Sequence, residues 1–429
     1  MSACAATPCG LPRIFTTTTP ISTGCSARCI GRFEPAMTAN LDLARARAET
    51  PGVGHVVHLN NCGAGLMPEP VLRALTEHLR LEAEIGGYEA AERREDAVEA
   101  TYDALARLLN CRPEEIAVVE NATVAWDMAF YGQRFRAGDR ILTAMAEYAS
   151  NYIAFLQMAE RTGVEVVVVP NDESGQLDVA ALANLLDART KLIAVTHVPT
   201  NGGLVNPAAA IGRLARAAGV PFLLDACQSV GQMPIDVEAI GCDMLSATAR
   251  KFLRGPRGVG FLYVRHAMLD RLSPPFLDLH AATWTARHRY TLRPDARRFE
   301  NWENYIAGKL ALGVAADYAL GWGLPAIWSR VHALAEDLRQ RLAGLPGVTV
   351  RDLGRLRSGI VSFQAAGRDP LALKAALAKE GINISTTSVA STRLDMEARS
   401  IPLMNRLGVH YYNSEDELER FVGALQRQL

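Results

Sequence analysis

The fold is most strongly indicated by SATARKFLRGPRGVGFLYV, from Ser246 to Val264, which places Lys251 in a loop rich in glycine and arginine. Upstream, the apolar run VPFLLDACQSVGQ, from Val220 to Gln232, leads into a lone carboxylate at Asp225. The lysine follows that carboxylate by 251 − 225 = 26 residues. A lysine amine that forms a Schiff base and a carboxylate that pairs with a protonated ring nitrogen are what a pyridoxal phosphate (PLP) site needs.

Short apolar runs alternate with helical patterns from about residue 70 onward. The runs are rich in valine, isoleucine and leucine without polar alternation, which is typical of strands buried on both faces. We expect strands at Ile116–Glu120, Arg140–Met145, Val164–Pro170, Leu192–His197, Phe222–Asp225 and Val259–Val264. This alternation predicts an α/β domain with a mainly parallel sheet. Ligands of such sheets bind at the carboxyl ends of strands, where Glu120, His197 and Asp225 lie.

The chain is predicted to have four parts. Residues 1–50 contain TTTTPISTG and bury little, so we expect a disordered extension, with a targeting peptide or a later start at Met37 as alternatives. Residues 51–70 are expected to line the site, residues 71–324 to form the large α/β domain, and residues 325–429 to form a smaller α+β domain. Residues 265–325, rich in aromatic and arginine residues, are expected to be a long connection.

Composition limits the partners. The 429 residues are 49% hydrophobic and 21% charged with a net charge of −1, so nothing indicates nucleic acid or an anionic membrane as a partner. No apolar run approaches the roughly 20 residues that a membrane helix needs.

Cys25 and Cys29 have no second cysteine or histidine pair at metal-ligand spacing, so no metal site is expected. The later cysteines indicate core thiols of a reducing compartment, which predicts a cytoplasmic protein.

Further segments at the predicted strand ends carry polar groups that suit a cofactor. Glu120-Asn121-Ala122-Thr123 ends a strand and starts a helix, whose N-terminus attracts phosphate. Tyr148, within Ala146–Asn151, suits stacking on a ring. In THVPTNGG, Thr200 and Asn201 have donors that suit the ring hydroxyl.

The remaining groups lie beside Asp225 and Lys251. Gln228 follows Asp225 by three residues and suits the ring oxygen, and Thr248 precedes the lysine. Arg250 and Arg254, together with partial burial, are expected to lower the pKa of Lys251. Each segment alone has an ordinary explanation, such as a helix cap, a half-buried tyrosine, a plain loop or a solvated basic loop. Their order within one α/β domain favours a shared site.

The chain resembles the class V aminotransferase family of fold-type I PLP-dependent enzymes, which also includes cysteine desulfurases, kynureninases and isopenicillin N epimerase-like proteins. The motifs that carry the resemblance are LLDACQSVGQ, the lysine loop, THVPTNGGLVNP and RLGVHYYNSEDEL, and it covers roughly residues 55 to 429. It implies the fold-type I architecture with a mainly parallel, seven-stranded-type sheet in the large domain. It also implies PLP as cofactor, a small amino-acid substrate, and a homodimer with sites at the interface.

The resemblance also implies roles for individual residues. Lys251 is the Schiff-base lysine, Asp225 pairs with the pyridine nitrogen, Gln228 contacts the ring oxygen, and Tyr148 stacks on the ring. Arg406 binds the substrate α-carboxylate, and Asn61, in LNNCGAG, lines the site. The phosphate is held by Ala122, Thr123, Thr248 and Arg250. RRFENWEN, residues 297–304, is the segment that a partner subunit would lend.

One departure from the family bears on the reaction. Desulfurases carry a nucleophilic cysteine on a late loop, but here Asn383 to Asp395 reads NISTTSVASTRLD, and no cysteine follows Cys242. Persulfide chemistry needs that thiolate, so desulfurase activity of the usual kind is not expected. The STTSVAST loop and the region of Trp284, His288 and Arg289 are expected to shape the side-chain pocket.

The expected function is chemistry at Cα of an amino acid, with Lys251 as general base. Family membership places transamination first, and β-elimination from an S-substituted cysteine or epimerisation are the alternatives. A non-catalytic scaffold is the alternative of another class, although Lys251, Asp225 and Arg406 are all retained. A nucleotide-dependent oxidoreductase is disfavoured because no GxGxxG follows the first strand of a βαβ unit.

Overall fold

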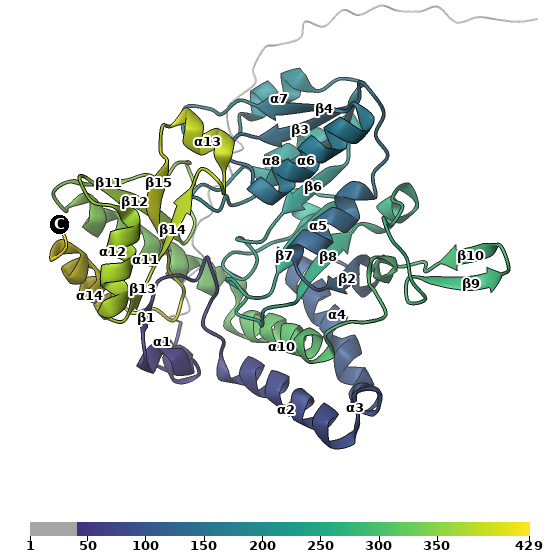
Figure 1. The fold of residues 1–429 in the computed structure, drawn as a ribbon, viewed down its shortest axis with the longest axis horizontal. Helices are drawn as coiled ribbons and strands as arrows, with labels where there is room; N and C mark the ends of the chain where they lie inside the picture. The colour runs from purple at the N-terminus through teal and green to yellow at the C-terminus, as the bar shows by residue number, and fades with distance from the viewer. Residues whose placement is uncertain (1–40) are drawn as a thin grey trace, which may run out of the picture. The chain divides into compact units, whose positions relative to one another are not determined.

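The computed structural model describes residues 41–429 (Figure 1). Residues 1–40 lie outside the described residues, and with them Met37, Cys25, Cys29 and most of the expected N-terminal extension. The helix α1 (Leu43–Ala48) begins directly after Asp42, whose carboxylate accepts a hydrogen bond from the Arg45 backbone N–H at 3.0 Å. The expected disorder therefore does not extend over residues 43–48, because this capped helix packs through its buried Ala46.

A seven-stranded sheet forms the centre of the larger part of the chain (Figure 1). Its strand order is β2-β8-β7-β6-β5-β3-β4, and β8 runs antiparallel to both of its neighbours while the other pairs are parallel. The strands are β2 (Ile116–Val119), β3 (Arg140–Ala144), β4 (Glu165–Val169), β5 (Thr190–Thr196), β6 (Phe222–Asp225), β7 (Met244–Thr248) and β8 (Gly260–Val264).

Strand β7 was not among the expected strands, although it lies at the centre of the sheet. Its sequence MLSAT ends in small and hydroxylic residues, which carry little strand signal on their own. All five residues are buried because β6 and β8 flank the strand and helices cover both faces of the sheet. Successive residues of β2 point to opposite faces of the sheet. Ile116 and Val118 pack into the hydrophobic core on one face, and Ala117 and Val119 pack into the core on the other.

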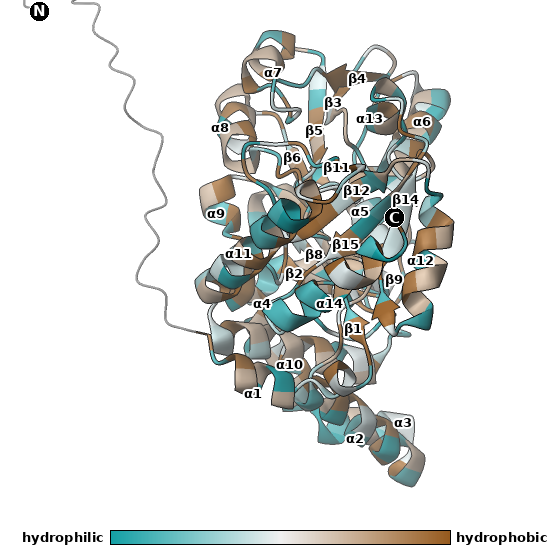
Figure 2. Cartoon of the chain, turned by 90° about the vertical axis from the view of Figure 1, so that its left-hand side faces the viewer, coloured by the Kyte–Doolittle hydropathy of each residue, from teal (hydrophilic) through white to brown (hydrophobic). Residues whose placement is uncertain are grey.

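Helices cover the two faces of this sheet and continue below it (Figure 1). Outer helices such as α8 and α11 carry both hydrophilic and hydrophobic residues, as expected of helices with one buried side (Figure 2). The helices before the small domain are α2 (Glu69–Ile85), α3 (Gly87–Arg93), α4 (Glu95–Leu109), α5 (Ala122–Tyr131), α6 (Ala149–Thr162), α7 (Val179–Leu185), α8 (Ala208–Ala218), α9 (Val237–Ile240) and α10 (Ile306–Trp322).

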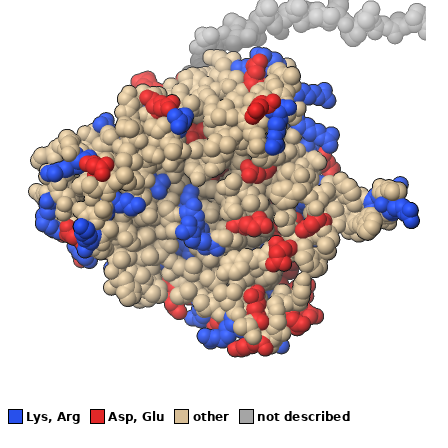
Figure 3. Space-filling model, in the orientation of Figure 1, with Lys and Arg blue, Asp and Glu red and all other residues tan. Residues whose placement is uncertain are grey.

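The segment expected to be a long connection contains regular structure. Strands β9 (Ala282–Ala286) and β10 (Arg289–Leu292) form an antiparallel hairpin that projects from the body of the protein (Figure 1). Its tip is basic on the face shown in Figure 3, and Trp284 is 79% exposed. Helix α10 follows and is buried on most of its surface, so it lacks the amphipathic pattern by which a surface helix is recognised.

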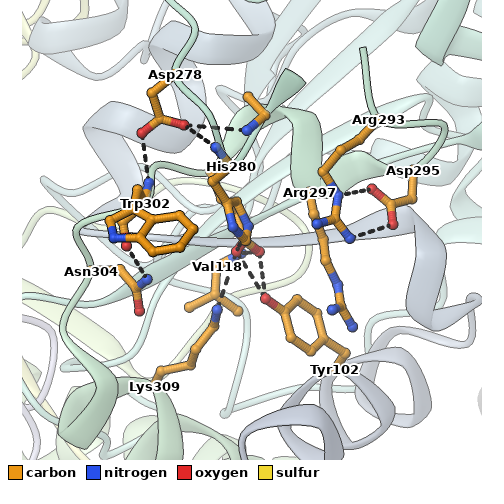
Figure 4. A network of polar contacts seen from close by, with 12 residues as sticks. Tyr102, Val118, Asp278, His280, Arg293, Asp295, Arg297, Trp302, Asn304 and Lys309 are labelled. Carbon is orange, nitrogen blue, oxygen red and sulfur yellow. Dashed lines mark hydrogen bonds and ion pairs between the residues drawn. The ribbon is translucent and has the colours of Figure 1, made fainter. Parts of the chain in front are cut away.

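A buried carboxylate anchors the base of the hairpin (Figure 4). Glu300 accepts hydrogen bonds from the Tyr102 hydroxyl at 2.8 Å, the Val118 backbone N–H at 2.7 Å and the Lys309 ammonium at 3.1 Å. Burial raises the pKa of Glu300, but the His280 ring, Lys309 and these donors outweigh it and hold the pKa below its usual value. The central carboxylate of RRFENWEN is thus engaged within its own chain.

The smaller part of the chain begins with α11 (Leu324–Ala343), close to the expected boundary at residue 325. It contains an antiparallel four-stranded sheet of order β11-β12-β15-β14. Near its amino end the chain adds β1 (Val57–His58), which pairs in parallel with β13. The other elements are β11 (Val348–Val350), β12 (Ile360–Ala365), α12 (Pro370–Lys379), β13 (Ile382–Asn383), β14 (Ser385–Ser388), α13 (Arg393–Ala398), β15 (Leu403–Gly408) and α14 (Glu415–Gln426).

Within residues 41–429 no single helix is both long enough and apolar enough to cross a membrane. Helices α10 and α11 meet these two requirements only when taken together, and a bend of 79° separates them.

Candidate active site

A cavity of about 460 Å³ lies where the carboxyl ends of β5, β6 and β7 meet the start of α5. Nine of the twelve residues expected at a site line it, which means that the sequence motifs meet at one place. They are Ala122, Thr123, Tyr148, Thr200, Asp225, Gln228, Thr248, Arg250 and Lys251. The lining also includes Asn121, Val124, Thr196, Val198 and Cys227.

The start of α5 forms one end of the cavity. The cap of this helix is Asn121, whose side-chain oxygen accepts hydrogen bonds from the backbone N–H groups of Thr123 at 2.9 Å and Val124 at 3.0 Å. Asparagine is a favoured cap because its side chain reaches the second and third N–H groups of the helix. The helix start and the hydroxyl groups of Thr123 and Thr248 make this end suitable for a phosphate.

Asp225 ends β6 at the opposite side of the cavity and is 4% exposed. One carboxylate oxygen accepts a hydrogen bond from the Cys227 backbone N–H at 2.9 Å, and the other from the Asn151 side-chain amide at 3.0 Å. Both donors are uncharged. Because a buried carboxylate is stabilised best by a cation, the arrangement suits a protonated ring nitrogen in the cavity.

Gln228 lies beside Asp225 with part of its hydrogen-bonding capacity unused. Its amide nitrogen donates to the Cys62 carbonyl at 3.1 Å, while its side-chain oxygen is buried without a partner among the described residues. Buried polar atoms of native proteins nearly always have a partner, so this atom indicates a ligand.

Lys251 reaches the cavity from the loop after β7, and its electrostatic surroundings favour the neutral amine. Burial lowers the pKa of Lys251, while Cys227 and Asp225 raise it and the positive charges of Arg250 and Arg406 lower it further. The net effect is a lowered pKa. A neutral amine is the form that attacks a carbonyl carbon, so this lysine is suited to Schiff-base formation.

Arg254 was expected to lower the pKa of Lys251, but the arginines that do so are Arg250 and Arg406. Arg254 adopts φ 62° and turns its guanidinium away from the cavity. There it donates to the Leu66 carbonyl at 2.7 Å, the Tyr411 hydroxyl at 2.6 Å and the Thr50 hydroxyl at 2.6 Å. These contacts tie the lysine loop to the amino-terminal segment and to the small domain.

Arg406 lies on β15 at the edge of the cavity rather than in its lining. Its guanidinium donates to the Ser385 hydroxyl at 3.0 Å, and to both the carbonyl and the hydroxyl oxygen of Thr200 at 2.7 Å. All three acceptors are uncharged, so its positive charge is available to a carboxylate ligand. The contacts with Thr200 also join the small domain to the large one.

Two expected site residues point elsewhere. The Asn61 amide donates to the Gly408 carbonyl at 2.7 Å and its oxygen accepts from the Tyr412 hydroxyl, so this fully buried side chain packs the amino-terminal segment. The Asn201 amide donates to the Asp395 carboxylate at 2.7 Å instead of facing the cavity. Sequence motifs place such residues near a site, but they do not give the direction of the side chain.

The late loop that follows β14 is held against the large domain. The Ser391 carbonyl accepts a hydrogen bond from the backbone N–H of Ala149, the residue after Tyr148, at 3.0 Å. Asp395 reaches across to Asn201 and is also paired with Arg399 at 3.1 Å. Neither this loop nor the hairpin with Trp284, both expected to shape the side-chain pocket, contributes to the cavity lining of its own chain.

His197, at the end of β5, provides a pH test of the folded state. It is 7% exposed, and burial lowers its pKa to about 4. Because the folded pKa lies below the usual 6.5, the full stability is present above pH 6.5 and is lost as the pH falls toward 4. We expect His197→Gln to reduce this acid loss by up to about 2 kcal/mol between pH 7.5 and pH 5, measured from the free energies of unfolding in urea of wild type and variant at the two pH values. Parallel pH profiles of the two proteins would contradict it.

These features together fit PLP. The cavity has a helix start for the phosphate, a buried carboxylate opposite, an amide oxygen without a partner, and a lysine whose pKa is lowered. Tyr148, which is 36% exposed, caps the start of α6 and also lines the cavity. The distribution of charge and of unused hydrogen-bonding groups matches a molecule with a phosphate at one end and a basic ring nitrogen at the other.

The chain is similar to known proteins both in sequence and in structure. The family model described as Aminotransferase class-V matches residues 57–421. A cysteine desulfurase of Pectobacterium atrosepticum is 30% identical over 400 residues, covering 90% of this chain and 97% of that protein. The solved apo cysteine desulfurase from Thermococcus onnurineus NA1 has a TM-score of 0.84 at 26% identity, covering 90% of this chain and 97% of that one. The cystine C–S lyase C-DES, solved with its product cysteine persulfide, has a TM-score of 0.79 at 25% identity, covering 88% and 99%.

Proposed function

The chain belongs to the class-V aminotransferase family of PLP-dependent enzymes, and from this premise we propose that it is a β-eliminating C–S lyase that acts on an S-substituted cysteine. Lysis of a carbon–sulfur bond is also the reaction for which the cystine C–S lyase C-DES is named. Transamination, which family membership alone places first, becomes the alternative.

The late loop carries this proposal. In this chain Asn383 to Asp395 offers serine and threonine hydroxyls but no thiol, and Ser391 is bound to the start of α6. A desulfurase passes sulfur to a protein thiolate, which hydroxyl groups cannot replace because they are not ionised near neutral pH. Sulfur therefore has to leave with a small-molecule product. That outcome is β-elimination.

PLP, when bound, supplies an electron sink that makes the Cα proton of the amino acid acidic. Lys251 first holds the cofactor and then, as the free amine, takes the Cα proton. Asp225 keeps the ring nitrogen protonated, and Arg406 fixes the α-carboxylate through its two-pronged guanidinium. Ala122, Thr123, Thr248 and Arg250 would hold the phosphate, and Tyr148 would stack on the ring. Gln228 and Thr200 would donate to or accept from the ring oxygen, whereas Asn201 and Asn61 support the surrounding loops.

The proposed β-elimination needs no reactant other than the amino acid and water. The Cα–H and Cβ–S bonds break, the proton goes to Lys251 and the electron pair of the Cβ–S bond leaves with sulfur as a thiolate. Hydrolysis of the remaining three-carbon enamine then gives pyruvate and ammonia. No oxidant or reductant is needed.

The test uses the PLP-loaded protein with L-cystine and S-methyl-L-cysteine, and it measures pyruvate, released thiol or persulfide, and the visible absorption of the cofactor. We expect multiple turnovers with equal amounts of pyruvate and sulfur product, and none with Lys251→Ala. Transamination would instead convert the cofactor to pyridoxamine phosphate and yield an oxo acid that retains sulfur, which would overturn the proposal. Retention of PLP without any product would favour the scaffold.

We also propose a cytoplasmic homodimer. The described cysteines Cys62, Cys111, Cys227 and Cys242 are free thiols, as expected in a reducing compartment. The projecting hairpin exposes Trp284 by 79% and Tyr290 by 59%, and large exposed aromatic residues are typical of a contact surface. Sedimentation of the holoenzyme tests this proposal.

A further inference from the structure

A chain of three buried polar side chains runs behind the cavity. The amide nitrogen of Asn151 donates one hydrogen bond to the Glu147 carboxylate at 2.8 Å and another to the Asp225 carboxylate at 3.0 Å. All three residues are at most 4% exposed. Of the three, only Asp225 lines the cavity. Glu147 therefore acts on a bound ring only through residues that it contacts, and its link to Asp225 runs through Asn151.

Glu147 is fixed by the elements on which it rests. One of its oxygens accepts a hydrogen bond from the Tyr148 backbone N–H at 3.0 Å, and the other from the Thr196 backbone N–H at 3.0 Å. The hydroxyl groups of Thr143, at 3.1 Å, and Thr196 also bond to it. Because a backbone N–H faces each oxygen, a carboxylate fits this site, whereas a glutamine would place its NH₂ group against one of them.

This arrangement fixes the rotation of Asn151. Both hydrogens of its amide nitrogen are used, one toward each carboxylate, so the amide cannot turn without losing both bonds. Asp225 in turn has one donor on each oxygen, Asn151 on one and the Cys227 backbone on the other. A lone pair remains for a ring proton.

The charge of Glu147 also acts on Asp225. Burial raises the pKa of Glu147 to about 7, and the negative charge of Asp225 adds to this rise, while the hydrogen bonds from Thr196 and Asn151 oppose it. Two carboxylates that share one amide donor compete for it, so the charge of one affects how strongly the other attracts a proton.

We propose that Glu147 and Asn151 are positioning residues that hold the Asp225 carboxylate against the ring nitrogen of PLP and set how tightly the ring proton is held. The proposal rests on PLP as the cofactor and not on the identity of the substrate. It assigns a function to two residues whose side chains do not reach the cavity.

The experiment compares Asn151→Ala, Glu147→Gln and the double variant with wild type. Two readouts are independent of turnover: the dissociation constant of PLP, from quenching of protein fluorescence, and the pH midpoint at which the visible absorption of bound PLP changes. Glu300→Gln is the matched control, because Glu300 is equally buried and also accepts several hydrogen bonds, but none of its partners lines the cavity.

We expect Asn151→Ala to weaken PLP binding about tenfold, the equivalent of one lost hydrogen bond to a charged group. Both single variants should move the spectral midpoint by at least about half a pH unit. The double variant should show the same PLP affinity and spectral midpoint as Asn151→Ala, because the effects of two substitutions are not additive when both act through the same contacts. Glu300→Gln should lower the melting temperature without moving either readout.

Three results would overturn the proposal. An unchanged midpoint and affinity in Asn151→Ala would show that Asp225 needs no support. Effects of Glu147→Gln that persist in full in the Asn151→Ala background would mean that Glu147 acts by another route. Equal shifts in Glu300→Gln would reduce the effect to general loss of stability. Should Glu147→Gln fail to fold, Asn151→Ala and Asn151→Ser, which keeps a single hydroxyl donor, still decide the outcome.

Discussion

Replacement of Lys251 by alanine is expected to reduce turnover at least about 10⁴-fold, because one change removes both the covalent hold on the cofactor and the base that takes the Cα proton. Lys251 is the only lysine in the cavity lining, and its pKa is already lowered by burial, so no neighbouring amine replaces it. Pyruvate release from S-methyl-L-cysteine measures the effect.

The control for this variant is Lys191→Ala, since Lys191 lies on β5 with an exposed side chain and only contacts the Ala188 carbonyl. Mass spectrometry after borohydride reduction adds a second readout. PLP should be fixed covalently to the wild type and to Lys191→Ala but not to Lys251→Ala. Covalent fixation that survives in Lys251→Ala would show that another amine holds the cofactor.

Asp225→Asn should produce the second largest loss, about 10²- to 10³-fold in kcat, because an amide of the same shape cannot balance a positive charge on the ring nitrogen. The change also disturbs the hydrogen bonds on both sides, since the new NH₂ group would face the donor of either Asn151 or the Cys227 backbone. We expect weaker PLP binding as well as slower turnover.

A neighbouring aspartate provides the matched control. Asp243 precedes β7, accepts a hydrogen bond from the Phe222 backbone N–H at 3.0 Å and lies outside the cavity lining. Asp243→Asn should lower stability but keep kcat within about twofold, as expected for a residue that contacts neither cofactor nor substrate. If both variants lost activity equally, Asp225 would have no special role at the ring.

The motifs predicted the cavity because each of them lies at a strand end. In a parallel sheet, chain segments that follow neighbouring strands necessarily meet at one edge. Thr200, Asp225 and Lys251 are therefore brought together by the order of β5, β6 and β7, although β7 itself was not expected. The lysine motif indicated the position even where the strand pattern was too weak to show the element.

Other features depended on packing between distant segments. Arg254 lies in the same loop as Arg250, four residues later, yet Tyr411, more than a hundred and fifty positions away, binds it and turns it from the cavity. Asn201 is likewise drawn aside by Asp395 of α13. Helix α10 escaped detection because neighbours bury it on most sides, which removes the polar stripe that reveals a helix.

The hydrogen-bonded residues Glu147, Asn151 and Asp225 show which features the sequence predicted and which only the tertiary structure decided. Residue types and their spacing determined the lysine, the carboxylate, the cofactor class and the α/β class, since these follow from local pattern and from the geometry of strand ends. The direction of each side chain was decided by long-range contacts. Burial and hydrogen bonding between β3, β5, β6 and α6 put two further residues behind Asp225, and no local pattern encodes a contact between segments 74 residues apart.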